Sequence, residues 1–287
     1  MIGGTVTVLG RAARAARRAG LGRGLALARD AVDAPLVRLG RPPLQASGLT
    51  GVEVRGFLRH RSFLADVARP DAGGYQRLLA ATVKPGGTVI DGGAHIGVYS
   101  LIAAAAAGPT GRVLAFEPDP YNLAALRANA RRAQRSGSAP IEVVAKALAD
   151  GPGRTTFLQS SGTISGSLAD RDGSGLARAL EVELTSIDDE LPVAPASLVV
   201  KLNVEGAEQR VLAGMQRTLA GCPDIALFVE LNPKALRAAG TDPGELVTRL
   251  EGLGFTLQSI DPLDESLRPL PPLDELAKGH MLCRRRC

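Results

Sequence analysis

The segment from residue 88 to residue 107 constrains the fold of this chain more than any other. A short apolar run, residues 88–90, ends in Asp91 and a pair of glycines, and an alanine-rich stretch over residues 98–107 follows. This order predicts a buried strand, a tight turn and the start of a helix. Gly93 and Gly97 allow unusual backbone angles in the turn, and the free N–H groups of the helix favour an electron-rich ligand beside them.

A second acid, Glu117, stands 20 residues after Gly97, at the end of the apolar run over residues 113–116. An acid at the end of the second strand of a βαβ unit is well placed to accept hydrogen bonds from ribose hydroxyl groups. The two features together indicate a nucleoside ligand. Three residues separate Gly93 from Gly97, so the G-x-G-x-x-G fingerprint of dinucleotide-binding folds is broken.

The remaining pattern, Asp-x-Gly-x-x-x-Gly, resembles motif I of the class I S-adenosylmethionine-dependent methyltransferases. Two further motifs in the same order resemble the FkbM-like family within that class: Phe116-Glu117-Pro118, and Lys201-Leu202-Asn203-Val204-Glu205-Gly206-Ala207-Glu208 followed by Val211-Leu212. The resemblance covers roughly residues 73–283. It implies an α/β fold with a doubly wound, mostly parallel seven-stranded sheet, preceded here by an N-terminal helical extension.

The resemblance also implies S-adenosylmethionine as the cofactor and assigns the residues that contact it. The expected contacts are Asp91, Gly92, Gly93, His95 and Gly97 at the first turn, Glu117 and Pro118 after the second strand, and Ala147 and Leu148 beside the adenine. For Ala147 and Leu148, ordinary packing at a strand end is an alternative interpretation.

Candidate catalytic residues follow the apolar runs that end near Asn203 and Glu230, because ligands bind at the carboxyl ends of strands in open parallel sheets. Transfer of a methyl group to a hydroxyl oxygen needs an acceptor for the hydroxyl proton, and Glu205, Glu230 and His95 are the candidates. The FkbM-like family commonly has Asp at position 203. An amide cannot act as a general base, so any such role has been lost here or has moved to Glu205.

Asn203, Glu230 and Asn232 raise the further alternative of oxygen ligands to a divalent cation, as in some O-methyltransferases. Three hydrogen-bonding residues at strand ends explain the same pattern. The trio carries a single formal charge, so the expected site contains no metal.

The chain of 287 residues is long enough for one sizeable α/β domain with an extension. Residues 1–41 hold eight arginines and two aspartates, a net charge of +6; the whole chain carries +5, so the remainder carries −1. We expect a basic, helix-rich extension over residues 1–50 and a methyltransferase domain over residues 51–287.

The extension is either a cap that packs on the domain or a segment that contacts an acidic membrane surface or partner. Binding of nucleic acid is not expected, because aromatic platforms and a recognisable motif are missing.

A cytoplasmic location is expected, because the sequence has no membrane-spanning apolar run and no secretory core. We expect its three cysteines, Cys222, Cys283 and Cys287, to be reduced.

The sequence predicts further elements by pattern. One or two strands are expected over residues 51–67. His60 is expected in a solvated charged turn, with a substrate contact as the alternative. Helices are expected over residues 75–83 and 119–135, the second capped by Asp119, and a third parallel strand over residues 141–148. Other expected features are an added strand over residues 154–159, a polar loop over residues 160–167 that either closes over substrate or is a surface loop, and final strands near residues 256–260 and 280–283.

The resemblance implies a hydroxyl group of a sugar or polyketide-like molecule as the methyl acceptor, with an amine as the nearest alternative. A second class of function is a cofactor-binding or interaction module of the same fold without turnover. Asn203 keeps this second interpretation open.

Overall fold

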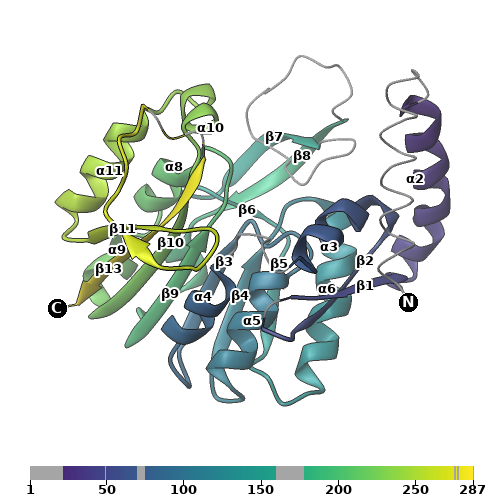
Figure 1. Ribbon diagram of the computed structural model, residues 1–287, viewed down its shortest axis with the longest axis horizontal. Coiled ribbons are helices and arrows are strands. Elements are labelled where there is room, and N and C mark those ends of the chain that lie inside the picture. The colour runs from purple at the N-terminus through teal and green to yellow at the C-terminus, as the bar shows by residue number, and fades with distance from the viewer. Residues whose placement is uncertain are drawn as a thin grey trace.

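A computed structural model describes residues 22–48, 50–69, 75–159, 178–274, 276 and 278–286. The polar loop expected over residues 160–167 and the first half of the basic extension lie outside these residues. In the part described, eight strands form one large sheet in the order β12-β11-β13-β10-β9-β3-β4-β5 (Figure 1). These strands are β3 (Thr88–Gly92), β4 (Arg112–Phe116), β5 (Ile141–Val144), β9 (Ser197–Leu202), β10 (Asp224–Leu231), β11 (Thr256–Ile260), β12 (Leu267–Arg268) and β13 (Gly279–Arg286).

The five neighbouring strands β10, β9, β3, β4 and β5 are parallel, and β13 is antiparallel between β10 and β11. This arrangement confirms the predicted doubly wound, mostly parallel sheet, to which the two-residue strand β12 adds an eighth member at the edge. Parallel strands that are buried on both faces read as continuous apolar runs, as β3, β4 and β9 do.

Helices cover both faces of this sheet. The helices are α2 (Gly22–Arg38), α3 (Arg61–Val67), α4 (Gln76–Thr82), α5 (Val98–Ala107), α6 (Pro120–Gln134), α7 (Ile187–Glu190), α8 (Glu208–Ala213), α9 (Gln216–Gly221), α10 (Pro233–Ala238) and α11 (Pro243–Gly252), with a 3₁₀ turn, η1, at Leu58–His60. Val89 packs into the core with α4 and α5, and its neighbour Ile90 packs into the other core with α8 to α11. Successive side chains of a strand point to opposite faces of the sheet, and each helix buries its apolar side against one face. The result is an apolar layer on each face of the sheet.

The helix α6 begins as the sequence predicts. The Asp119 carboxylate accepts a hydrogen bond of 2.8 Å from the backbone N–H of Tyr121, and Pro120 occupies the first helical position. Because α6 starts directly after Glu117, this cap fixes the helix beside the end of β4.

The third strand differs from the prediction, which was one strand over residues 141–148. Its first part, β5, pairs with β4, whereas Ala147 and Leu148 form a separate strand, β6, that pairs with β8 (Arg178–Thr185). Together with β7 (Gly153–Gln159), which confirms the expected added strand, β6 and β8 form a three-stranded sheet. A continuous apolar run does not reveal a change of pairing partner, because both partners accept the same kind of residue.

The region over residues 51–67 contains one strand, within the one or two predicted. This strand, β2 (Glu53–Gly56), pairs antiparallel with β1 (Leu44–Ser47), so the hairpin crosses the expected domain boundary at residue 50. The chain then turns into η1 and α3. His60 is not in a solvated turn: it is buried, with 3% of its surface exposed.

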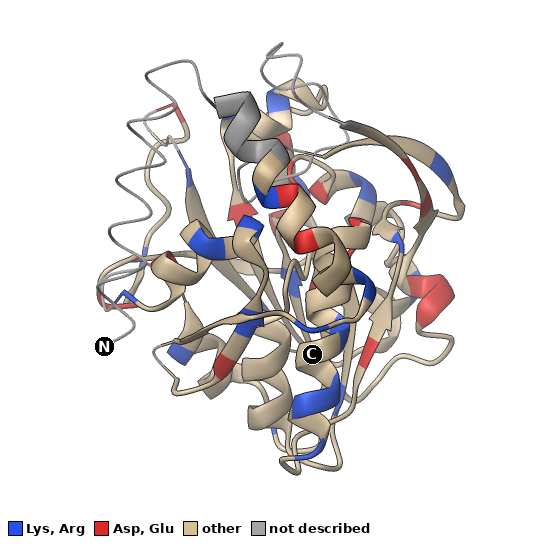
Figure 2. Ribbon diagram, turned by 90° about the vertical axis from the view of Figure 1, so that its right-hand side faces the viewer, with Lys and Arg blue, Asp and Glu red and all other residues tan. Residues whose placement is uncertain are grey.

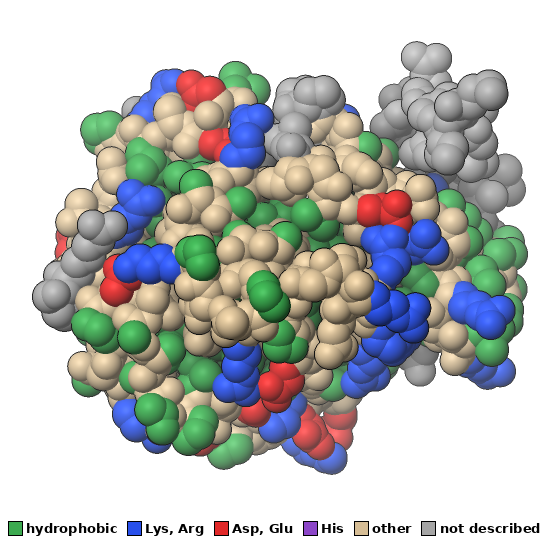
Figure 3. Space-filling model, turned by 90° about the horizontal axis from the view of Figure 1, so that it is seen from below, with side chains coloured by type: hydrophobic (Ala, Val, Ile, Leu, Met, Phe, Trp, Pro, Cys, Tyr) green, Lys and Arg blue, Asp and Glu red, His purple; other side chains and the backbone are tan. Residues whose placement is uncertain are grey.

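The extension packs on the domain through α2, which contacts η1 and α6. Figure 2 views this side of the molecule, where acidic and basic residues both occur along α2. Seen from below, Lys and Arg side chains gather on the right, the side of α6 and β1 in Figure 1 (Figure 3). Cys222 and Cys283 are buried, and neither forms a disulfide within the part of the chain that is described. Among the described residues, no helix combines the length and apolarity needed to cross a bilayer.

Candidate active site

A cavity of about 230 Å³ lies where the carboxyl ends of β3, β4 and β9 meet. Strand ends of an open parallel sheet are the usual place for a ligand. Eight of the predicted site residues line the cavity: Gly93, His95, Glu117, Pro118, Ala147, Leu148, Asn203 and Glu205. The other four, Asp91, Gly92, Gly97 and Glu230, are not among the residues that line it.

The turn after β3 forms one wall and can be built only with glycine at its start. Gly93 has a φ of +73°, and a Cβ atom there would lie 2.1 Å from the backbone oxygen of Asn203. The backbone N–H groups of Gly93 and Ala94 both donate to the carbonyl of Phe116, at 3.0 and 2.9 Å. The turn is therefore clamped between the ends of β4 and β9.

Behind this turn lies a buried ion pair between Asp91 and Lys201. The two residues are directly opposite each other on β3 and β9, and their charged atoms are 3.1 Å apart. The Lys201 ammonium also donates to the carbonyls of Gly92 and Gly93, at 3.0 and 2.8 Å, and Ser100 donates to Asp91 at 2.5 Å. Asp91 thus fixes the turn from behind, while Lys201 reaches the cavity.

Lys201 was not among the predicted site residues, although the sequence carries a signal for it. It lies in the apolar strand over residues 198–202, and a lysine there needs an anionic partner to offset its desolvation. The acid at the end of the neighbouring strand is such a partner.

Glu117 lies on the cavity wall with its carboxylate held by three donors. The backbone N–H groups of His95 and Asp119 donate at 2.8 and 2.9 Å, and the Asn122 amide donates at 3.2 Å. Burial raises the pKa of Glu117 to about 7; nearby Asp119 adds to the increase, and the three hydrogen bonds oppose it. The position of each carboxylate oxygen is therefore fixed before any ligand binds.

The wall formed by the end of β9 carries Asn203 and Glu205. Glu205 is half-buried with a φ of +55°, a conformation that is uncommon for residues other than glycine and often occurs at functional sites. The side-chain oxygen of Asn203 is buried and has no hydrogen-bond partner among the described residues. A buried acceptor without a partner on a cavity wall is a ready contact for a donor group of a ligand.

Glu230 lies one layer behind the cavity. Its carboxylate is 2.7 Å from the Lys278 ammonium and 3.7 Å from the His280 ring, and its side chain is 2% exposed. Burial raises the pKa of Glu230, Glu205 adds to the increase, and Lys278 lowers it. Lys278 lines the cavity, so Glu230 forms an ion pair with a cavity residue although it does not line the cavity itself.

The three residues considered as metal ligands are not brought together at the cavity. Glu230 binds Lys278, and the Asn232 side chain accepts from the backbone N–H of Ala235 at 3.2 Å as the cap of α10. Only Asn203 lines the cavity. In the part of the chain that is described, no group of three His, Cys, Asp or Glu residues is arranged to hold a metal ion.

His95 is a half-buried member of the cavity wall. Its ring lies edge-on to Phe63 and His60, with centroid distances of 4.5 and 5.2 Å. Burial lowers the pKa of His95 well below its usual value, and the nearby His60 and Lys201 lower it further. Phe63 comes from α3, so the segment that precedes the predicted core of the domain contributes to the cavity.

The remaining wall is apolar and includes Ala147 and Leu148 of β6 with Phe157 of β7. These side chains are all at least nine-tenths buried. A flat apolar surface of this kind suits a planar aromatic base.

Comparison with known proteins gives a family match over more than half of the chain. The family model for the methyltransferase FkbM domain matches residues 91–257. The chain is 31% identical over 210 residues to the 31-O-demethyl-FK506 methyltransferase FkbM of Streptomyces tacrolimicus, an alignment that covers 63% of this chain and 77% of that relative.

Two solved structures are similar at lower identity. The precorrin-6y C5,15-methyltransferase of Geobacter metallireducens is 12% identical, with a TM-score of 0.40 and coverage of 74% of this chain and 87% of that one. A SAM-dependent methyltransferase from Aquifex aeolicus is 14% identical, with a TM-score of 0.42 and coverage of 78% and 95%.

Proposed function

Because this chain belongs to the FkbM family of methyltransferases, we propose that it transfers a methyl group from S-adenosylmethionine to a hydroxyl group of a small molecule. The observation that carries the proposal is the cavity itself. On its walls the fixed carboxylate of Glu117 and the turn at Gly93 accompany the polar groups of Asn203 and Glu205.

The cavity residues fit the parts of S-adenosylmethionine. Glu117 offers lone pairs to the two ribose hydroxyl groups, since each carboxylate oxygen can accept more than one hydrogen bond. Ala147, Leu148 and Phe157 offer an apolar surface to the adenine. The unpartnered side-chain oxygen of Asn203 offers an acceptor to the ammonium group at the amino acid end.

S-adenosylmethionine supplies an electrophilic methyl group that leaves its sulfur as the acceptor oxygen forms the new bond. The chain's own task is to hold the acceptor in line and to take up the hydroxyl proton. We assign that proton to the Glu205 carboxylate, which lines the cavity. His95 is a poorer base because burial lowers its pKa, and Glu230 holds Lys278 instead.

The acceptor class is supported by the relative in Streptomyces tacrolimicus, whose name specifies methylation of an oxygen atom. We propose a hydroxyl group on a sugar or a polyketide-like molecule. The alternative is a cofactor-binding module of the same fold with weakened turnover, and the observation in its favour is an amide, Asn203, at the end of β9.

The first experiment is calorimetric titration of the full chain with S-adenosylmethionine and S-adenosylhomocysteine, with Glu117→Ala alongside. We expect binding in the micromolar range, about −8 kcal/mol, that is weakened in the variant. Absence of binding by the folded, unaltered chain would contradict the proposal. Consumption of S-adenosylmethionine with hydroxylated acceptors then separates an enzyme from a binding module.

A further inference from the structure

A series of contacts, two sets of hydrogen bonds joined by the backbone of η1, connects the N-terminal extension to the carboxylate of Glu117. It starts in α2 at Asp33, which is fully buried. The Asp33 carboxylate accepts from the backbone N–H groups of Leu58 and Arg59, both at 3.0 Å, and from the Tyr121 hydroxyl. These contacts hold η1 against the start of α6.

The turn held by Asp33 carries His60, and the hydrogen bonds of this side chain fix its orientation and its tautomer. The backbone N–H of Phe57 donates to His60 Nδ1 at 3.1 Å. A backbone N–H can only donate, so Nδ1 must be the unprotonated nitrogen and the proton must be on Nε2. Burial lowers the pKa of His60 to about 4, which keeps the ring neutral.

The direction of each later hydrogen bond follows from this one. His60 Nε2 lies 3.0 Å from the Asn122 side-chain oxygen and must donate to it. The amide nitrogen of Asn122 therefore faces the other way, where it donates to Glu117 Oε1 at 3.2 Å. Asn122 also lines the cavity. The Glu117 carboxylate can only accept, so it and the His60 proton favour the same orientation of the amide, and His60 adds the hydrogen bond that holds the Asn122 oxygen.

We propose that Asn122 is a cofactor-binding residue at the ribose end of the cavity, and that His60 and Asp33 are positioning residues that orient Asn122 and Glu117. The inference rests on the proposed function, because it takes the ligand of Glu117 to be a ribose. It makes the extension a structural part of the cofactor site.

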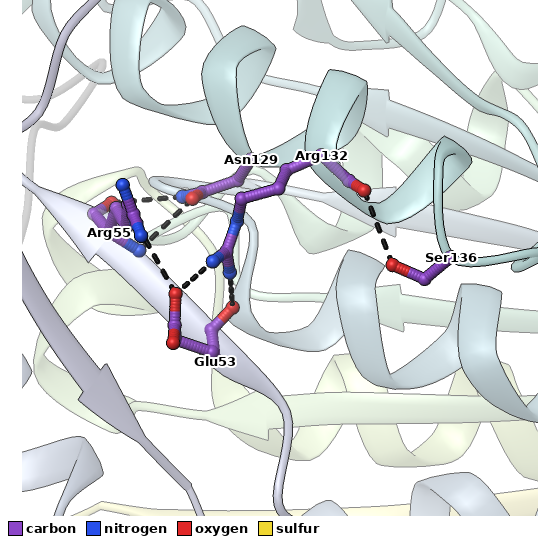
Figure 4. A network of polar contacts seen from close by, with 5 residues as sticks. All are labelled: Glu53, Arg55, Asn129, Arg132 and Ser136. Carbon is purple, nitrogen blue, oxygen red and sulfur yellow. Dashed lines mark hydrogen bonds and ion pairs between the residues drawn. The ribbon is translucent and has the colours of Figure 1, made fainter.

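The structure offers a matched control, because a second set of contacts ties the hairpin to α6 without reaching Glu117. Arg132 donates to the side chain of Glu53 and, at 2.6 Å, to its backbone oxygen. Asn129 exchanges hydrogen bonds with the backbone of Arg55 (Figure 4). A variant of Arg132 therefore loosens the contact between β2 and α6 and leaves the contacts of Asp33, His60 and Asn122 intact.

The test measures binding of two ligands to the full chain by calorimetry: S-adenosylhomocysteine and its 2′,3′-dideoxy derivative, which lacks the ribose hydroxyl groups. We expect His60→Phe to weaken the binding of S-adenosylhomocysteine about five- to tenfold, the effect of one or two lost hydrogen bonds. The affinity of this variant for the dideoxy ligand should equal that of the unaltered chain. We expect His60→Gln, which keeps a donor near the Nε2 position, to stay within about twofold of the unaltered chain on both ligands.

Arg132→Met is expected to leave the ratio of the two affinities unchanged. Equal weakening of both ligands by His60→Phe, or no weakening of either, would overturn the inference. Asn122→Ala must also weaken the binding of S-adenosylhomocysteine and leave the binding of the dideoxy ligand unchanged. This second variant tests the inference if His60→Phe does not fold. Failure of the unaltered chain to bind S-adenosylhomocysteine would instead overturn the proposed function, and the inference with it.

Discussion

At the residue scale, Glu205 is the side chain on which turnover should depend. Glu205→Gln keeps the shape of the side chain and removes its capacity to accept a proton, so we expect the rate with a hydroxyl acceptor to fall about 10²- to 10⁴-fold. Affinity for S-adenosylhomocysteine should change less than about twofold, because no ribose contact is lost. Steady-state rates and calorimetry measure the two quantities.

Glu230→Gln is the control for Glu205, because Glu230 is a second candidate glutamate that does not line the cavity. A rate for Glu205→Gln that equals the rate of the unaltered chain would rule out Glu205 as the base. A loss confined to Glu230→Gln would move the role to the Glu230 and Lys278 pair.

The turn at Gly93 gives a second residue-scale prediction. We expect Gly93→Ala to lower the free energy of unfolding by more than about 3 kcal/mol, because a positive φ and a close contact with backbone are combined there. Gly137 has a positive φ with open space around it, and Gly151 has neither constraint. Urea unfolding should show a loss of about 1 kcal/mol for Gly137→Ala and almost none for Gly151→Ala.

At the scale of elements, the register between β3 and β9 depends on the Asp91 and Lys201 pair. Lys201→Met leaves the Asp91 carboxylate buried without its cation, so we expect a loss of about 3–5 kcal/mol in the free energy of unfolding. The exposed pair of Arg112 and Glu142, which joins β4 to β5, is the comparison within the same sheet. Arg112→Met should cost less than about 1 kcal/mol in the same unfolding assay. Similar losses for both variants would contradict a special role for the buried pair.

At the scale of the whole molecule, buried ionisable groups set the pH dependence of stability. Glu117 and Glu208 have pKa values raised to about 7 by burial. The folded chain binds these protons more tightly than the unfolded chain, so their stabilisation is present at low pH and is lost as the pH rises through about 7. His60 and His280, with pKa values lowered to about 4 by burial, have the opposite effect: their contribution is lost as the pH falls below about 6.5.

These opposed effects can be separated with Glu208→Gln, which removes one carboxyl group from a position outside the cavity wall. The stability of the unaltered chain relative to this variant should fall as the pH is raised from about 5 to about 7.5. Urea unfolding at several pH values measures the difference. For Glu251→Gln, at an exposed position on α11, the difference should stay constant. A constant difference for Glu208→Gln as well would contradict the assignment.

The expected boundary at residue 50 does not separate the extension from the domain in the folded chain. Its strand β1 pairs with β2 of the domain, and Asp33 of α2 binds the backbone of η1. The composition of residues 1–50 indicates a basic helical segment, but it contains no signal for a buried aspartate that binds residues 25 positions later.

The sequence alone determined the parts of this protein whose cause is local. The turn at Gly93, the acid Glu117 and the polar residues Asn203 and Glu205 each follow directly from a strand, and parallel strands end at one edge of the sheet. The pattern and the family resemblance together therefore predicted eight residues of the cavity wall.

The tertiary structure decided what depends on contacts between distant segments. It split residues 141–148 between two sheets, placed Glu230 behind Lys278, and brought His60 to Asn122 across 62 positions of the chain. Strand pairing and hydrogen bonds of this kind depend on which distant segments of the chain lie side by side. The local periodicity of the sequence contains no information about that. The fold and the position of its cavity are thus determined by residue pattern, whereas the orientation of the groups that line the cavity is determined by packing.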